Sequence, residues 1–133
     1  MIVDTSAVAA IVLGEPEREP FYRAMADAPS RRISAASVVE LIEVYARKLR
    51  LEDPRAQLLA DLTRMGLSIV PVTAEQAHVA VEARLQYGKG RHRAALNFGD
   101  SFVYALAKVT DEPLLFKGDD FAHTDVRTAL PQV

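Results

Sequence analysis

The residues MIVDTSA, at positions 1–7, decide the fold class of this chain. Met1–Val3 is a short apolar run that predicts a β-strand, and the small apolar residues 6–13 predict a helix directly after it. Strands that alternate with helices form parallel sheets, so a repeat of this pattern predicts an α/β fold with a central parallel β-sheet. The pattern returns with three more short apolar runs, separated by segments of helical periodicity, at 33–35, 67–72 and 114–116.

The predicted helices are delimited by capping residues, proline and glycine. Gly14 stops the first helix, and the next is predicted to run to about Ala28. Further along, the predicted helix starts are Pro16, Ser37, Asp53 and Thr73, and a last long helix ends at 111–113. The helix that follows Thr73 is expected to end at Gly88 and to bury one face, made of Ala77, Ala80, Val81 and Leu85.

The length and composition predict one domain with one sizeable core, because the chain has 133 residues and half of them are apolar. Its 18 acidic and 16 basic residues give a net charge of −2, so any contact with a polyanion must use a local basic patch. The absence of cysteine excludes disulfides, thiolate metal sites and cysteine nucleophiles. Without an export signal or a run of about 18 apolar residues, we expect a cytoplasmic protein that does not contact membranes.

Four carboxylates are predicted to gather at one edge of the sheet, the edge where ligands bind in parallel α/β folds. Asp4 follows the first strand, Glu40 follows the second, and Asp100 and Asp119 lie before and after the fourth. Taken singly, each also has a structural explanation, a helix cap or first-turn charge for the first three and a turn for Asp119. Glu43, one helical turn after Glu40, is an alternative at the second position.

A cluster of carboxylates indicates a metal site. Like charges at close range repel and raise one another's pKa, so such a cluster is tolerable chiefly when a cation neutralises it. Hard oxygen ligands select Mg²⁺ or Mn²⁺. Either ion can position a water molecule, lower its pKa and stabilise charge on a phosphodiester during in-line displacement. The residues therefore predict metal-dependent hydrolysis of nucleic acid.

At these positions the sequence resembles the PIN-domain ribonucleases, and specifically the VapC toxins of type II toxin–antitoxin pairs. The resemblance implies a single PIN domain over residues 1–133, with a three-layer α/β/α architecture in which helices flank the central parallel sheet. It covers nearly the whole chain and is carried by four segments, MIVDTSA at 1–7, ISAASVVE at 33–40, LNFGDSF at 96–102 and LLFKGDDF at 114–121.

The resemblance further implies a ribonuclease that hydrolyses RNA phosphodiesters at an acidic site holding Mg²⁺, for which Mn²⁺ can substitute. The implied catalytic and metal-binding acids are Asp4, Glu40, Asp100 and Asp119. Asp120 is the alternative to Asp119, since relatives place this acid at slightly different distances from the preceding phenylalanine. Thr5 or Ser6, together with Asn97, are expected to orient ligands or water.

The implied partners are an RNA substrate and a cognate VapB-type antitoxin, whose carboxy-terminal part wraps the toxin and often blocks the acidic pocket with a basic side chain. The implied assembly is a homodimer or a toxin–antitoxin hetero-oligomer. The basic residues of a glycine-flanked loop before Asp100 either hold RNA phosphates or form a solvated surface, and the sequence leaves both readings open. They are Lys89, Arg91, His92 and Arg93.

Two other functional classes compete with a metal-dependent nuclease. In phosphoaspartyl transfer Asp4 would itself be the nucleophile, but the second aspartate expected two residues later is Ser6 here. A non-catalytic binding domain of the same fold is disfavoured by the intact Asp4, Glu40 and Asp100.

Overall fold

The computed structural model describes residues 1–131. Within them, four parallel strands form one sheet in the order β3-β2-β1-β4. The strands are β1 (Ile2–Val3), β2 (Arg32–Ser34), β3 (Ser68–Val70) and β4 (Leu114–Leu115). Ile2 in β1 lies opposite Arg32 on one side and opposite Leu114 on the other. The predicted parallel sheet is confirmed. Three strands, β1, β3 and β4, are shorter than the apolar runs that indicated them, and β2 begins one residue earlier than its run.

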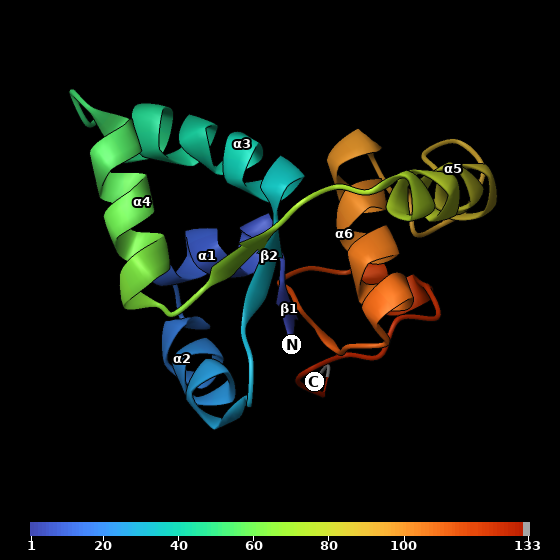
Figure 1. Ribbon diagram of the computed structural model, residues 1–133, viewed down its shortest axis with the longest axis horizontal. Helices are drawn as coiled ribbons and strands as arrows, with labels where there is room; N and C mark the ends of the chain where they lie inside the picture. Colours follow the sequence, from blue (N-terminus) through green and yellow to red (C-terminus); the bar gives the residue numbers. More distant parts are fainter. Residues whose placement is uncertain (132–133) are drawn as a thin grey trace.

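Helices connect the strands in the predicted alternation (Figure 1). They are α1 (Thr5–Val12), α2 (Arg18–Asp27), α3 (Ala35–Glu43), α4 (Pro54–Arg64), α5 (Ala74–Tyr87) and α6 (Phe98–Thr110). A π-helical turn, η1 (Val44–Lys48), continues α3, and a 3₁₀ turn, η2 (Phe121–His123), follows β4. The caps predicted at Asp53 and Thr73 are confirmed, since each side chain accepts a hydrogen bond from a backbone N–H in the first turn of its helix. Within the described residues, no helix combines the length and the apolar character that crossing a membrane requires.

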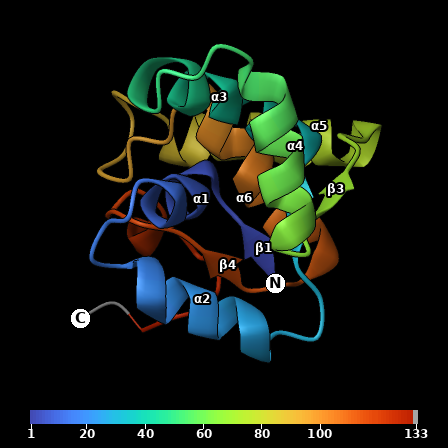
Figure 2. The same cartoon turned by 90° about the vertical axis from the view of Figure 1, so that its left-hand side faces the viewer.

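The sheet separates two hydrophobic cores, which makes the three layers of the predicted fold. Neighbouring strand residues point to opposite faces, so Val3 packs with α1 to α4 whereas Ile2 packs with α5 and α6. Figures 1 and 2 show these two groups of helices on opposite sides of the strands. The α/β/α architecture expected from the sequence is therefore present.

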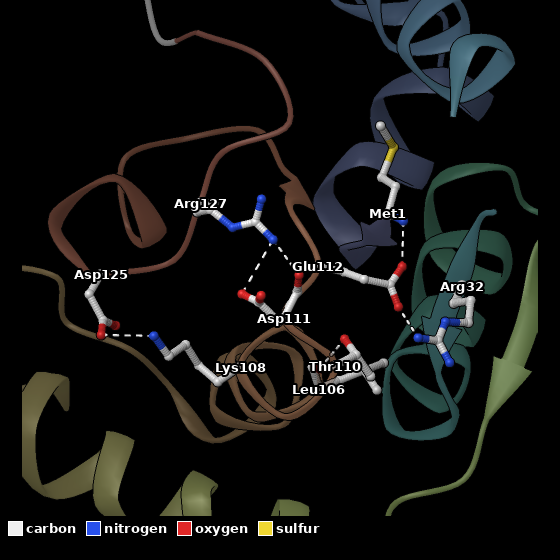
Figure 3. Close-up of polar contacts among 9 residues, drawn as sticks. All are labelled: Met1, Arg32, Leu106, Lys108, Thr110, Asp111, Glu112, Asp125 and Arg127. Atoms are coloured by element: carbon white, nitrogen blue, oxygen red, sulfur yellow. Dashed lines mark hydrogen bonds and ion pairs between the residues drawn. The ribbon is translucent and has the colours of Figure 1, made fainter. Parts of the chain in front are cut away.

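A polar cluster ties together the edge of the sheet at which the strands begin. The Glu112 carboxylate accepts from the Met1 amino group through one oxygen and from the Arg32 guanidinium through the other (Figure 3). Glu112 lies just before β4, so this single side chain joins Met1, directly before β1, and Arg32 of β2 to the approach to β4. These contacts hold together the edge of the sheet at which the strands begin, opposite the edge at which they end.

The start of α3 differs from the prediction. The Ser34 hydroxyl, rather than Ser37, caps the helix by accepting from the Ala36 N–H at 3.2 Å, and Ser37 is buried within the first turn. Both serines fit a cap, and the pairing of β2 through Ser34 decides where the chain leaves the sheet. Glu40 consequently lies well inside α3 and has no part in capping it.

The buried face of α5 also differs from the prediction. Ala80 is buried as expected, but Ala77 is exposed, and Val81 and Leu85 are 57% and 55% exposed. The face packed against α6 is instead made of Gln76, Ala80, Ala83 and Tyr87, at spacings of four, three and four residues. Val81 and Leu85 line an apolar groove of about 400 Å³ beside Phe98 and Phe102 of α6.

Candidate functional site

The ends of β1 and β2, together with the starts of α1, α3 and α6, meet at one edge of the sheet. Figure 1 shows α3 and α6 beginning on the same side of the strands, and the two helices contact each other. Asp4, Glu40 and Asp100 reach this edge from α1, α3 and α6 respectively. The connection topology, rather than sequence proximity, brings these acids together.

Asp4 is buried at the end of β1 and caps α1. Its Oδ2 accepts from the Ser6 amide at 3.0 Å and from the Ser6 hydroxyl at 2.6 Å. Burial raises the pKa of Asp4, the hydrogen bonds from Ser6 and Thr5 oppose this rise, and the charge of Asp120 adds to it. The same Asp4 side chain therefore caps α1 and belongs to the group of acids at this edge of the sheet.

Ser6 also fastens Asp4 to the far end of the chain. Its Oγ accepts from the amide of Lys117, two residues after β4, at 2.9 Å. The Lys117 ammonium in turn pairs with Glu15 and Glu17 beyond α1. Sequence analysis missed this role of Ser6 because 111 residues separate it from Lys117, and no local pattern indicates such a contact.

Glu40 extends from α3 toward the start of α1. Its Oε1 accepts from the Thr5 hydroxyl at 3.3 Å. Partial burial of the carboxyl group raises the pKa of Glu40, and the charge of Asp4 raises it further against the hydrogen bond from Thr5. Glu43, the alternative at this position, is exposed and pairs with Arg47 at 2.9 Å, so it does not join the cluster.

Asp100 lies in the first turn of α6 and forms a capping box with Asn97. The Asn97 Oδ1 accepts from the Asp100 amide at 2.9 Å, and the Asp100 Oδ2 accepts from the Asn97 amide at 3.0 Å. Burial raises the pKa of Asp100 to about 7, and the charges of Asp4, Asp120 and Glu40 add to it against the Asn97 hydrogen bond. The negative charges of the other three acids thus all raise the pKa of Asp100.

The pair Asp119-Asp120 supplies the remaining acidic group. Asp120 is the member whose charge raises the pKa of both Asp4 and Asp100. Asp119 is exposed, and its carbonyl accepts from the Ala122 amide at 3.1 Å in the turn that begins η2. The electrostatic neighbour of the cluster is therefore Asp120.

The four acids are neighbours rather than a closed cage. Among residues 1–131, no three acidic, histidine or cysteine side chains converge closely enough to enclose a metal ion. The donor set nevertheless fits a hard divalent cation, because every group is a carboxylate oxygen and the buried Asp4 has a raised pKa. Burial and neighbouring negative charges raise the pKa of Asp4, Glu40 and Asp100. A bound cation would lower these pKa values again, because it favours the charged carboxylates.

The basic loop between α5 and α6 is held by its backbone. The Leu96 amide donates to the Tyr87 carbonyl at 2.9 Å, and the His92 ring packs edge-on against Tyr87 with centroids 5.1 Å apart. His92 is therefore a packing residue. The exposed cations of the loop, which make no ion pair within residues 1–131, are Lys89, Arg91 and Arg93.

Comparison with known proteins gives one consistent result. The PIN domain family model matches residues 1–127. Ribonuclease VapC42 of Mycobacterium tuberculosis is 48% identical over 132 residues, covering 97% of this chain and 98% of the relative. Ribonuclease VapC30 of the same species is 46% identical over 133 residues, covering 98% of this chain and the whole relative.

Solved structures agree in fold. The crystal structure of VapC20 from Mycobacterium tuberculosis, a toxin that cleaves the sarcin-ricin loop, has a TM-score of 0.73 at 21% identity, over 94% of this chain and 95% of that one. A toxin–antitoxin complex from Klebsiella pneumoniae has a TM-score of 0.72 at 21% identity, over 97% of both chains.

Proposed function

The chain belongs to the PIN domain family and groups with its VapC ribonucleases, and from this membership we propose that it hydrolyses RNA phosphodiester bonds as a type II toxin. The observation that supports this function in the molecule itself is the meeting of Asp4, Glu40, Asp100 and Asp120 at the carboxyl edge of the sheet. We take residues 1–133 as one PIN domain. An RNA substrate would place its action in the cytoplasm.

We propose that Asp4, Glu40 and Asp100 hold a divalent cation, Mg²⁺ with Mn²⁺ as a substitute, and that the Asp119-Asp120 pair supplies a fourth acid. When bound, the cation supplies Lewis-acid stabilisation of the phosphate and an activated water. Asp120 is the better candidate of the pair because its charge acts on Asp4 and Asp100.

The chain's own residues do the positioning. Ser6 orients Asp4 through two hydrogen bonds to Oδ2, Thr5 holds Glu40, and the Asn97 amide orients Asp100. Each of these donors comes from the first turn or cap of α1 or α6, where the helix dipole favours negative charge. The acids are thereby oriented before substrate arrives.

The test is RNA cleavage by the purified protein, freed of any partner, with and without Mg²⁺ or Mn²⁺. We expect Asp100→Asn and Glu40→Gln to reduce cleavage by at least about 100-fold, because the loss of a ligand costs no less than the loss of a residue that orients one. Glu43→Gln, the matched control one turn along α3, should cleave as the parent does. Cleavage by Asp100→Asn at the parent's rate would contradict the proposed site. Asp119→Asn and Asp120→Asn compare the two candidates for the fourth acid, and the larger loss is expected for Asp120→Asn.

The proposed partner is a VapB-type antitoxin, in a toxin–antitoxin hetero-oligomer or alongside a toxin homodimer. The relatives named VapC support this proposal, and the test is the reading frame directly upstream. Its product should co-purify with this chain and abolish RNA cleavage. A stand-alone ribonuclease would have no such neighbour.

A further inference from the structure

Gly99, the second residue of α6, has no conformational need to be glycine. Its backbone does not enter the positive-φ region that only glycine adopts freely, whereas Gly90 and Gly118 do. Glycine in a helix is also unfavourable, by about 1 kcal/mol relative to alanine. The reason for glycine at this position must therefore be the space that a side chain would fill.

That space is filled by the carboxyl group of Glu40. A Cβ atom built on Gly99 would lie 2.4 Å from Oε2, 2.6 Å from Cδ and 2.7 Å from Oε1 of Glu40. Contacts below 3.0 Å are essentially never made by real Cβ atoms, so a side chain at this position and the observed Glu40 carboxylate exclude each other. The carboxylate of α3 thus lies directly on the backbone of α6.

On its other side, the same carboxyl group is held by α1. The Thr5 hydroxyl donates to Oε1 at 3.3 Å, from the first residue of that helix. Glu40 is consequently placed between the first turns of two helices, whose N–H groups and dipoles both favour a negative charge. The Thr5 hydroxyl sets the distance of the Glu40 carboxylate from α1, and the missing side chain of Gly99 sets its distance from α6.

We propose that Gly99 is a positioning residue, whose absent side chain forms the seat that keeps the Glu40 carboxylate beside Asp100. The inference rests on the proposed function for the use of Glu40 in RNA cleavage, but the seat itself is a geometric claim. Because the displaced group would be the end of a flexible side chain, Gly99→Ala should move the carboxylate without disturbing the fold.

The geometric test is a crystal structure of Gly99→Ala. The Glu40 carboxylate is expected to withdraw by about 1 Å or more, since ordinary van der Waals contact with a Cβ begins near 3.4 Å instead of 2.4 Å, with α3 and α6 unmoved. A structure in which the carboxylate keeps its place against the added methyl group, or in which α6 shifts instead, overturns the proposal. This readout does not depend on metal binding or on cleavage.

The functional test is a double-mutant cycle read by Mn²⁺ titration calorimetry and by RNA cleavage. Gly99→Ala is expected to weaken Mn²⁺ binding and lower kcat by about tenfold each, with a melting temperature at or above that of the parent. In the Glu40→Ala background the same Gly99→Ala change should have no further effect, because there is no carboxylate left to displace.

The outcomes separate the two claims. Equal weakening of Mn²⁺ binding by Gly99→Ala in both backgrounds would show that the methyl group acts independently of Glu40. That result would overturn the proposal that Gly99 positions the Glu40 carboxylate. If the parent itself neither binds Mn²⁺ nor cuts RNA, the proposed function fails, and the position of Glu40 in the Gly99→Ala crystal still decides the role of Gly99.

Discussion

Asp4 is both the cap of α1 and a member of the acidic cluster, and the two roles make different demands on its side chain. A cap needs one oxygen that accepts hydrogen bonds, which Oδ2 provides to Ser6. A metal ligand needs the negative charge as well. The residue pattern Asp-Thr-Ser could not distinguish these roles. The structure shows the cap, and the role of Asp4 as a metal ligand is part of the proposed function.

Asparagine separates the roles, because it keeps the accepting oxygen and loses the charge. Asp4→Asn should stay within about 1 kcal/mol of the parent in free energy of unfolding, while RNA cleavage falls by at least about 100-fold, no less than for the loss of a residue that orients a ligand. Asp4→Ala, which removes the cap too, should lose about 1 kcal/mol more. Urea unfolding and a cleavage assay on the same preparations check this, and retained cleavage by Asp4→Asn would exclude a metal ligand there.

At the scale of elements, a buried carboxylate joins α4 to the π-helical turn that follows α3. Asp61 accepts from the Tyr45 hydroxyl at 2.7 Å, from Gln57 at 2.9 Å and from Arg64 at 2.5 Å. Burial, reinforced by the Asp61 hydrogen bond, raises the pKa of Tyr45 above its ordinary value, so its hydroxyl remains a donor. The turn thus anchors the end of the helix that carries Glu40.

Tyr45→Phe should destabilise the protein by about 1–3 kcal/mol, because a buried carboxylate loses a donor while the packing of the ring is kept. The matched control is Tyr22→Phe, whose half-buried ring lies under Arg18 and whose hydroxyl makes no hydrogen bond within residues 1–131. That variant should stay within about 0.5 kcal/mol of the parent. Urea denaturation measures both, and equal effects would show that the Asp61 contact contributes nothing.

A second link between elements ties α6 to the segment after η2 and makes stability depend on pH. Asp125 accepts from Tyr104 at 2.7 Å and from Lys108 at 3.0 Å, the latter pair visible in Figure 3. Burial acts to raise the pKa of Asp125, but the hydrogen bonds from Tyr104 and Lys108, together with the positive charge of Lys108, outweigh it and lower the pKa from its ordinary value.

A depressed pKa means that the charged form is favoured by folding, so this contribution is complete above the unfolded pKa and disappears as the pH falls through the folded one. Asp125→Asn should therefore melt at a lower temperature than the parent at pH 7. The difference should shrink as the pH falls below 3.8. Thermal melts across pH 2 to 7 measure it, and a difference that grows on acidification would reverse the assigned sign.

At the scale of the whole molecule, metal binding at the proposed site should appear as stability. A ligand that binds only the folded state adds about 2.7 kcal/mol when its concentration is 100 times its Kd. Mn²⁺ should therefore raise the melting temperature of the parent and not that of Asp100→Asn. Equal shifts in both proteins, measured at one salt concentration, would place the ion elsewhere.

The sequence predicted the layers of this molecule because they depend on local signals. Apolar runs indicated every strand, and the caps at Asp53 and Thr73 were correct. The predicted start of α3 was wrong because two serines fit a cap equally. The predicted buried face of α5 was wrong because the face that packs against α6 includes Gln76, while the apolar Val81 and Leu85 remain exposed. The sequence could predict that Asp4, Glu40 and Asp100 lie close together, because the order of strands and helices places all three at one edge of the sheet. It could not predict the Ser6–Lys117 hydrogen bond, because that contact depends on tertiary packing alone.

The order of strands has a consequence for synthesis of the chain. β1 precedes the other three strands of this sheet along the chain, yet one of its two neighbours is β4, so Ile2 can pair with Leu114 only after Leu114 has been synthesised. Pairing over such a separation is slow to form, because the entropy cost of closing a loop rises with the number of residues between the paired segments. A nascent chain on the ribosome can pair β1 with β2 early, but Asp4 acquires its surroundings only after Lys117 and Asp120 have been synthesised. The acidic edge of the sheet is therefore completed late in folding, after β4 has paired with β1.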